Sequence, residues 1–144
     1  MSSVLIIGGG ITGLQAAQHL SQVGAEVILV EQSDQLGGNL KALGSTFPEG
    51  RLAPELIEAR VNGINASPQV TVLTDAEITS LSGEYPQFKA GVKTSGGNKE
   101  IETQSVILAT GFLPFNPMDM KHYGFGKHPD VITSLELAGK FRDK

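Results

Sequence analysis

The sequence contains no cysteine and no tryptophan, so the 144-residue chain can form no disulfide bond, thiolate-held iron–sulfur cluster or redox-active cysteine pair of its own. It also lacks a basic block: 15 acidic and 11 basic residues give a net charge of −4, which disfavours a nucleic acid partner. No apolar run reaches the length of a membrane span, and no charged region precedes the apolar N-terminal stretch. We therefore expect a cytoplasmic protein without a membrane span.

Glycine, by contrast, is abundant, and its 18 residues indicate many tight turns. An apolar content of 40% and a charged content of 18% are ordinary for a globular protein, and the length suffices for one domain with a core. The most informative glycines lie near the N-terminus, where the apolar residues 4–7 lead into Gly8-Gly9-Gly10-Ile11-Thr12-Gly13.

A physical requirement explains each glycine of this Gly-x-Gly-x-x-Gly pattern. Gly8 permits a tight turn out of a strand, Gly10 lets the backbone approach a pyrophosphate, and Gly13 lets a helix lie close to the strand. The N-terminus of that helix presents free N–H groups and a partial positive charge to phosphates, and Thr12 adds either a hydroxyl donor or a helix cap. The pattern predicts a pocket for the ADP half of a dinucleotide.

The residues after the glycines complete the order strand, helix, strand and acid. Gly24 is expected to end a helix whose apolar face consists of Gly13, Ala16, Ala17, Leu20 and Val23. Residues 27–30 form an apolar run typical of a parallel strand that is covered on both faces. Glu31 ends this run, where a carboxylate accepts hydrogen bonds from ribose hydroxyls and repels a 2′-phosphate. Gln32 follows without a nearby arginine, which disfavours NADP.

A second glycine pair, Gly37-Gly38, follows soon after Glu31. In a NAD-binding Rossmann domain a simple helix usually follows the second strand, whereas flavoproteins place a Gly-Gly turn beside the ribose and pyrophosphate of FAD. By itself the pair is equally compatible with a plain loop. Combined with Glu31, it favours FAD over NAD as the ligand.

The rest of the chain predicts an α/β fold. The expected elements are a loop (41–51), a helix from 53 to about Asn62 that Gly63 breaks, a strand (70–73), a three-stranded antiparallel meander insert (76–104, with strands 77–81, 87–94 and 100–104) and a final buried strand (105–109). Thr133 and Glu136 have capping-box spacing for a C-terminal helix. We expect residues 1–144 to be a single, incomplete FAD-binding domain with a Rossmann-like parallel sheet, the meander insert and a turn-rich tail over 112–144.

These features stand in the order found in the FAD-dependent pyridine-nucleotide oxidoreductase group, which the sequence resembles. A closer resemblance, to the family of heterodisulfide reductase A subunits, rests on Leu36-Gly37-Gly38-Asn39, Leu52-Ala53-Pro54, Ala109-Thr110-Gly111-Phe112, Pro114-Phe115, Tyr123-Gly124-Phe125-Gly126 and Val131-Ile132-Thr133-Ser134-Leu135-Glu136. The resemblance implies an FAD-binding, electron-transferring protein that works with other redox subunits of a complex. It also implies that the backbone at Ile78 faces the adenine ring.

The chain departs from that family in two places. Pro48-Glu49-Gly50-Arg51 stands where the family commonly has cluster-holding cysteines, so we expect no cluster there. The group also closes its FAD domain with a later strand that carries Gly-Asp, after an inserted nicotinamide domain, and neither precedes Lys144. We therefore expect either the N-terminal part of a longer protein or a naturally short paralogue, with weakened FAD retention and no efficient turnover by this chain alone.

The expected cofactor-binding residues are Gly8, Gly10, Ile11, Thr12, Gly13, Glu31, Gln32, Gly37, Gly38, Asn39, Ile78, Ala109, Thr110 and Gly111. We expect no catalytic residue, because flavin hydride transfer needs no protein acid or base, and no metal site, because His122 and His128 lack further ligands at metal spacing. Two alternatives stay open: a NAD-binding Rossmann module, and a non-catalytic scaffold that docks a partner through residues 112–141.

Overall fold

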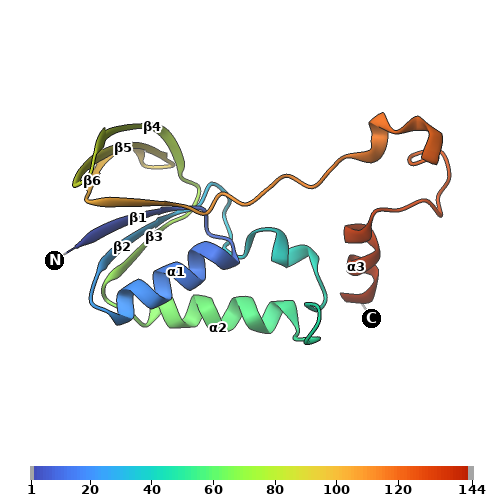
Figure 1. Cartoon of the computed structure of the whole chain (residues 1–144), viewed down its shortest axis with the longest axis horizontal. Helices are drawn as coiled ribbons and strands as arrows, with labels where there is room; N and C mark the ends of the chain where they lie inside the picture. Colours follow the sequence, from blue (N-terminus) through green and yellow to red (C-terminus); the bar gives the residue numbers. More distant parts are fainter. Residues whose placement is uncertain (1, 143–144) are drawn as a thin grey trace.

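The computed structural model describes residues 2–142, which form two sheets and the helices around them. A four-stranded parallel sheet lies in the middle, and helices α1 (Ile11–Gln22) and α2 (Ala53–Asn65) cover one of its faces (Figure 1). A three-stranded antiparallel sheet covers the other face. This arrangement confirms the predicted α/β class, with a parallel sheet and a meander.

The parallel sheet has the strand order β3-β2-β1-β7, so the two N-terminal strands lie at its centre. Its strands are β1 (Ser3–Ile7), β2 (Glu26–Val30), β3 (Val70–Leu73) and β7 (Ser105–Leu108). All neighbouring strands pair in parallel, so the carboxyl ends of β2, β1 and β7 meet along one edge of the sheet. The segments that follow these three ends are therefore neighbours in space, although they are far apart in the sequence.

Helix α1 packs on the sheet through its buried residues Gly13, Leu14, Ala17 and Ser21. Gly24 lies just after the helix end with a φ of +82°, which confirms the predicted stop. The predicted apolar face was wrong at Val23, whose surface is 80% exposed, and it omitted the fully buried Leu14. Val23 is the C-cap residue, so it has left the helical face before the chain enters β2.

Helix α2 continues beyond the predicted break, because Gly63 does not end it. A Cβ added at Gly63 would lie 2.6 Å from Nε2 of Gln18 in α1, the far end of a flexible side chain, so packing does not require glycine here. Glycine weakens a helix interior by about 1 kcal/mol, and the complete burial of the adjacent Ile64 offsets this loss. The helix therefore runs to Asn65.

The meander consists of β4 (Glu77–Glu84), β5 (Gln87–Thr94) and β6 (Gly97–Thr103). The middle strand has the predicted bounds, but the first strand ends later and the third begins earlier than predicted. The ladder explains both differences, because Glu84 pairs with Gln87 and Thr94 pairs with Gly97. Pairing thus continues up to two tight turns, and the glycines at the second turn belong partly to the strand.

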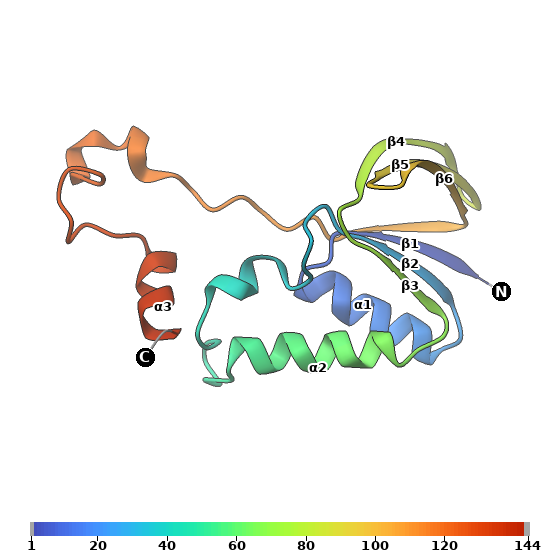
Figure 2. The same cartoon turned by 180° about the vertical axis from the view of Figure 1, so that it is seen from behind.

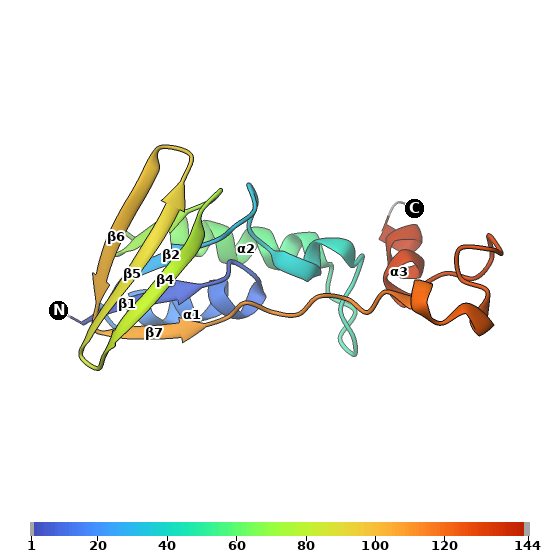
Figure 3. The same ribbon diagram turned by 90° about the horizontal axis from the view of Figure 1, so that it is seen from above.

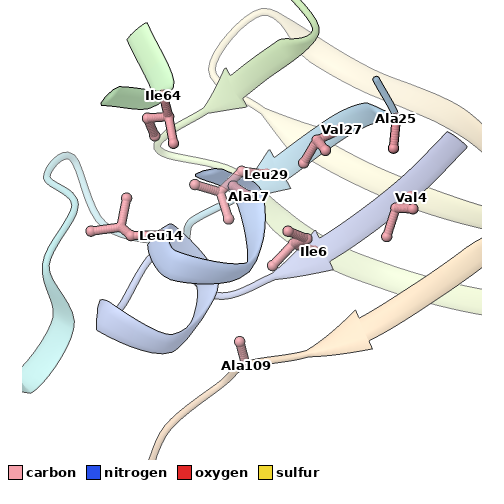
Figure 4. Packing of buried hydrophobic residues seen from close by; sticks show 9 residues of the cluster. All are labelled: Val4, Ile6, Leu14, Ala17, Ala25, Val27, Leu29, Ile64 and Ala109. Atoms are coloured by element: carbon pink, nitrogen blue, oxygen red, sulfur yellow. The ribbon is translucent and has the colours of Figure 1, made fainter. Parts of the chain in front are cut away.

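Two apolar layers, one on each face of the parallel sheet, form the core. The layer on the helix side consists of Val4, Ile6, Leu14, Ala17, Ala25, Val27, Leu29, Ile64 and Ala109 (Figure 4). The layer on the meander side consists of Leu5, Val30, Ala76, Ala90, Val92 and Ile101. Successive residues of β1 and β2 face opposite layers, which is why each of these strands contains an unbroken apolar run.

The C-terminal arm, residues 109–142, leaves the end of β7 and extends away from the sheets (Figures 2 and 3). It contains η2 (Pro117–Asp119), η3 (Lys121–Tyr123) and α3 (Ser134–Arg142). The predicted capping box of α3 is confirmed: the Glu136 N–H donates to Oγ1 of Thr133 at 3.1 Å, and the Thr133 N–H donates to Oε2 of Glu136 at 2.6 Å. The exposed apolar side chains of the arm are Phe112, Leu113, Phe115, Met118, Met120, Tyr123, Leu137 and Phe141.

Candidate functional site

The glycine loop, residues 8–13, connects β1 to α1 and is shaped by two steric contacts. Gly8 has a φ of +112°, and a Cβ added there would overlap the carbonyl oxygen of Ala109 at the end of β7. A Cβ added at Gly13 would overlap the carbonyl oxygen of Gly8. Both obstacles are backbone atoms that cannot rotate away. The loop therefore needs glycine at these two positions to bring the helix against the strand, as the sequence predicts.

Gly10 is under no such constraint. Its φ of −71° is open to any residue, and a Cβ added there would meet only the Cα of Gly38, at 3.9 Å. Gly10 is also the N-cap of α1, which has no side-chain cap among the described residues and no acidic residue in its first turn. The N–H groups and the positive end of the helix dipole therefore face the space beside Gly10 without a capping side chain or an acidic residue of the first turn.

Two further predicted residues, Ile11 and Thr12, form the first turn of α1, and both are exposed. They border a shallow groove of about 540 Å³ between α1 and α2. Thr12 does not cap the helix, because Gly10 occupies the N-cap position. The predicted cap is therefore wrong, and a role of the Thr12 hydroxyl as a donor to a ligand stays a prediction.

Glu31 follows β2 and is held by the backbone on both sides of its carboxylate. Its Oε2 accepts the Gly9 N–H at 2.7 Å, while its Oε1 accepts the Ser33 N–H at 2.9 Å and the Ser33 hydroxyl at 2.7 Å. Burial raises the pKa of Glu31, but the hydrogen bonds from Ser33 and Gly9 and the charge of Lys41 outweigh burial and hold the pKa below its ordinary value. The carboxylate is therefore ionised at neutral pH and fixed beside the glycine loop.

The Gly37-Gly38 turn lies directly on the glycine loop. Both residues have positive φ values, +118° and +54°, and the Gly37 N–H donates to the carbonyl oxygen of Gly9 at 2.8 Å. A Cβ added at Gly38 would lie 3.0 Å from the Cα of Gly10. The turn leads into the short helix η1 (Gly38–Ala42). The turn thus forms a second wall beside Gly10.

The segment after β7 supplies a third wall. The Ala109 N–H donates to the carbonyl oxygen of Ile7 at 2.8 Å, which keeps this segment beside the glycine loop. Thr110 and Gly111 follow and are exposed, and Gly111 has a φ of +70°. Asn39, in η1, reaches across and donates through Nδ2 to the carbonyl oxygen of Phe112 at 2.8 Å.

Two predicted residues lie outside these three walls. Gln32 is exposed next to Glu31. Ile78 packs against the apolar layer on the meander side, at the start of β4. It lies two residues after Ala76, whose N–H donates to the carbonyl oxygen of Glu31 at 3.0 Å. The backbone at Ile78 is therefore close along the chain to the Glu31 corner, while its side chain belongs to the core.

Three residues of the site were not predicted. Gly9 is one of them, because a Cβ there would lie 2.5 Å from Cδ2 of Leu36 and 3.1 Å from Oε2 of Glu31. Its position in an unbroken run of three glycines was the available signal. Ser33 and the carbonyl of Phe112 act through hydrogen bonds to other segments, and the sequence carries no pattern for such contacts.

The described residues show neither a metal-binding cluster nor a membrane-spanning helix. In residues 2–142, no group of three or more histidine, cysteine, aspartate or glutamate side chains is arranged to hold a metal ion. Within the same range, no helix combines the length and the apolar character that crossing a bilayer requires.

Residues 2–144 match the family described as pyridine nucleotide-disulphide oxidoreductase. Among curated proteins, the sequence is 36% identical to the iron-sulfur A-subunit 1 of CoB–CoM heterodisulfide reductase from Methanopyrus kandleri, over 94% of this chain and 32% of that protein. It is 23% identical to the A subunit of ferredoxin:CoB–CoM heterodisulfide reductase from Methanosarcina mazei, over 94% of this chain and 27% of that protein. The expected similarity to the family of heterodisulfide reductase A subunits is thereby confirmed.

The chain spans about a third or less of the length of these curated relatives. The alignment with the Methanopyrus protein runs over 214 residues, more than the 144 of this chain. The matched region of that relative therefore contains residues that have no counterpart here.

Solved structures share the fold. The L-proline dehydrogenase from P. horikoshii has a TM-score of 0.69 and 27% identity, over 76% of this chain and 22% of that chain. The thioredoxin reductase of Lactococcus lactis has a TM-score of 0.68 and 22% identity, over 82% of this chain and 38% of that chain. These oxidoreductases confirm the predicted FAD/NAD(P)-binding type of fold.

Proposed function

The chain belongs to the pyridine nucleotide-disulphide oxidoreductase family, and from this premise we propose that it is the FAD-binding part of a redox flavoprotein. The family and the fold suggest a flavin or nucleotide cofactor. The proposal goes further in three respects: the cofactor is FAD, the protein transfers electrons, and it works beside other redox subunits. The names of the relatives, which are A subunits of heterodisulfide reductases, support that place.

The observation that carries the proposal is the contrast between Gly10 and its neighbours. Packing explains the glycines at 8 and 13, because a Cβ at either position would overlap a backbone oxygen. Packing does not explain Gly10, where the nearest atom to an added Cβ is 3.9 Å away. A pyrophosphate lying against the backbone at Gly10, at the open N-terminus of α1, accounts for this glycine. The residues present thus fit the phosphates of a dinucleotide.

Glu31 supplies the second half of the ADP site. Because hydrogen bonds from Ser33 and Gly9 lower the pKa of the carboxyl against the effect of burial, it stays ionised and acts only as an acceptor. Oε1 already accepts two hydrogen bonds from Ser33, whereas Oε2 accepts only the Gly9 N–H and keeps a free acceptor site, to which a hydroxyl of an adenosine ribose can donate. The same negative charge repels a phosphate at the 2′ position.

The remaining residues of the proposed site hold and orient the cofactor. They are Ile11, Thr12 and Gly13 at the helix N-terminus, Gln32 beside the ribose, Gly37, Gly38 and Asn39 at the second wall, the backbone at Ile78 near the adenine, and Ala109, Thr110 and Gly111 at the third wall. When bound, FAD supplies the exchange between two-electron and one-electron carriers. The part of the protein is to bind the nucleotide, to set its orientation and to screen it from solvent.

Two other functions remain candidates, each on a specific observation. The glycine loop and Glu31 serve NAD as well as FAD, although the Gly37-Gly38 turn lying on Gly10 favours FAD. A non-catalytic docking role is favoured by the exposed apolar side chains of the C-terminal arm, among them Leu113 with 93% exposure. The experiment below separates these candidates.

The test is a titration of the whole purified chain with FAD, ADP and NAD, together with Gly10→Leu and Gly96→Leu variants. Gly96 is the matched control, because a Cβ added there meets only Oγ1 of Thr94, at 3.8 Å, on the meander. We expect FAD to bind, ADP to compete with it and NAD to bind more weakly. Gly10→Leu should weaken FAD by at least about tenfold, since the side chain fills the phosphate space.

The outcomes discriminate clearly. Equal FAD affinity in Gly10→Leu and wild type would contradict the site assignment. NAD binding tighter than FAD would favour the NAD-binding module. No binding of any of the three nucleotides, combined with association through the C-terminal arm, would favour the docking scaffold.

A further inference from the structure

One backbone hydrogen bond links the glycine loop to the second wall, and another links the end of β1, just before the loop, to the third wall. The Gly37 N–H donates to the carbonyl oxygen of Gly9, and the Ala109 N–H donates to the carbonyl oxygen of Ile7, both at 2.8 Å. These links do not depend on the identity of any side chain. Substitutions that keep the backbone path therefore leave them in place.

A side chain makes the third link, which joins the second wall of the site to the third. Nδ2 of Asn39 donates to the carbonyl oxygen of Phe112 at 2.8 Å and so joins η1 to a segment 73 residues later in the sequence. That segment has little packing of its own: a Cβ added at Gly111 would meet nothing within 4 Å, and the Phe112 side chain is 72% exposed. The amide of Asn39 thus fixes a stretch of backbone that the core does not hold.

The sheet order indicates which part of the ligand meets this segment. Glu31 follows β2, the glycine loop follows the neighbouring β1, and Ala109 follows β7 on the far side of β1. A dinucleotide with its adenosine ribose at Glu31 and its pyrophosphate at the glycine loop continues toward β7. The segment from Ala109 to Phe112 therefore faces the half beyond the pyrophosphate, a step that rests on the proposed function.

We propose that Asn39 is a positioning residue that acts through the backbone around Phe112. Its amide holds this segment at the distance from the glycine loop that the non-adenosine half of the dinucleotide requires. The adenosine half is held by Glu31 and the glycine loop, to which the Asn39 side chain makes no hydrogen bond in the described structure. Loss of the amide should therefore weaken binding of a whole dinucleotide such as FAD and leave ADP binding unchanged.

The experiment measures FAD and ADP affinities of the whole chain for wild type, Asn39→Ala, Asn39→Gln and Asn62→Ala. Asn62 is the matched control, an exposed asparagine on α2 away from the three walls. We expect Asn39→Ala to weaken FAD by about 2- to 10-fold, the range of one net hydrogen bond, and to change ADP by less than about twofold. Asn39→Gln, which keeps the donor, should recover most of the FAD affinity, and Asn62→Ala should change neither.

A double-mutant cycle with Gly111→Ala separates positioning from direct contact. Gly111 has a φ of +70°, so alanine there displaces the same segment. If Asn39 acts through that segment, the double variant loses no more FAD affinity than Gly111→Ala alone.

Fully additive losses would overturn the positioning role in favour of direct contact. Equal weakening of FAD and ADP by Asn39→Ala, or no weakening of either, would also overturn the proposal. A wild-type chain that binds neither nucleotide would instead refute the proposed function, which distinguishes the two failures.

Discussion

Replacing Gly13 by alanine tests whether the close approach of α1 to the glycine loop fixes this helix on the sheet. The added Cβ would overlap the carbonyl oxygen of Gly8 and lie 3.4 Å from Cγ2 of Ile6. The oxygen belongs to the backbone and cannot rotate away, so α1 has to shift outward by roughly 1 Å in a tightly packed interior. The shift loosens Leu14 and Ala17, which belong to the apolar layer on the helix side.

The expected loss of stability follows from two opposing effects. Overpacking a well-packed site costs about 1–3 kcal/mol, and a rigid obstacle places Gly13→Ala at the upper end of that range. Removing a glycine from a helix returns about 0.5–1 kcal/mol. We therefore expect a net decrease of about 2 kcal/mol in the free energy of unfolding.

Urea denaturation measures this decrease as a lower midpoint at an unchanged slope. The matched control is Gly139→Ala in α3, where an added Cβ meets nothing within 4 Å, so its stability should be unchanged or slightly higher. A Gly13→Ala variant as stable as wild type would refute the steric argument. It would also remove the packing reason for a glycine at this position.

Two further predictions concern Glu31. Burial raises the pKa of Glu31, but hydrogen bonds from Ser33 and Gly9 outweigh burial, so the pKa in the folded state is lowered. The ionised carboxylate therefore makes its whole contribution to the free energy of unfolding above the unfolded-state pKa near 4.3, and this contribution is lost as pH falls through the lower folded-state pKa. Denaturation at several pH values should show a difference in the free energy of unfolding between wild type and Glu31→Gln that is constant from about pH 6 to 8 and becomes smaller below about pH 4.3. A difference that grows on acidification would contradict the lowered pKa. In competition titrations, 2′,5′-ADP should bind at least about tenfold more weakly than 5′-AMP, which differs from it only by lacking the 2′-phosphate that the carboxylate repels, and Glu31→Gln should narrow the difference. Equal affinities in wild type would argue against a ribose at this corner.

Local sterics made much of the fold predictable from the sequence. The need for glycine at residues 8 and 13 follows from a strand that turns tightly into a close-packed helix, and the structure has this geometry. The error at Gly63 arose because helix propensity is a local property, whereas burial of the adjacent Ile64 in the core keeps the last turn of α2 helical. Tertiary packing is not encoded in the spacing of residues along one helix.

The site was predictable where it depends on residue type and less so where it depends on contacts between segments. The sequence indicated Glu31 and Gly37-Gly38 from their distance to the glycine loop. It could not indicate that Ser33 would hold the Glu31 carboxylate, because a serine two residues after an acid has no distinctive pattern. The contact between Asn39 and Phe112 spans 73 residues and depends on the whole sheet.

The division of the core into two apolar layers has a consequence for the meander. By connectivity β4–β6 are an insertion between two parallel strands, but Ala90, Val92 and Ile101 cover the face of the sheet opposite the helices. A chain without this insertion would expose that face to water and would lose solubility along with stability. The central strands β1 and β2 contribute buried residues to both layers, so amide hydrogen exchange should be slowest in these two strands, because their opening disrupts both layers.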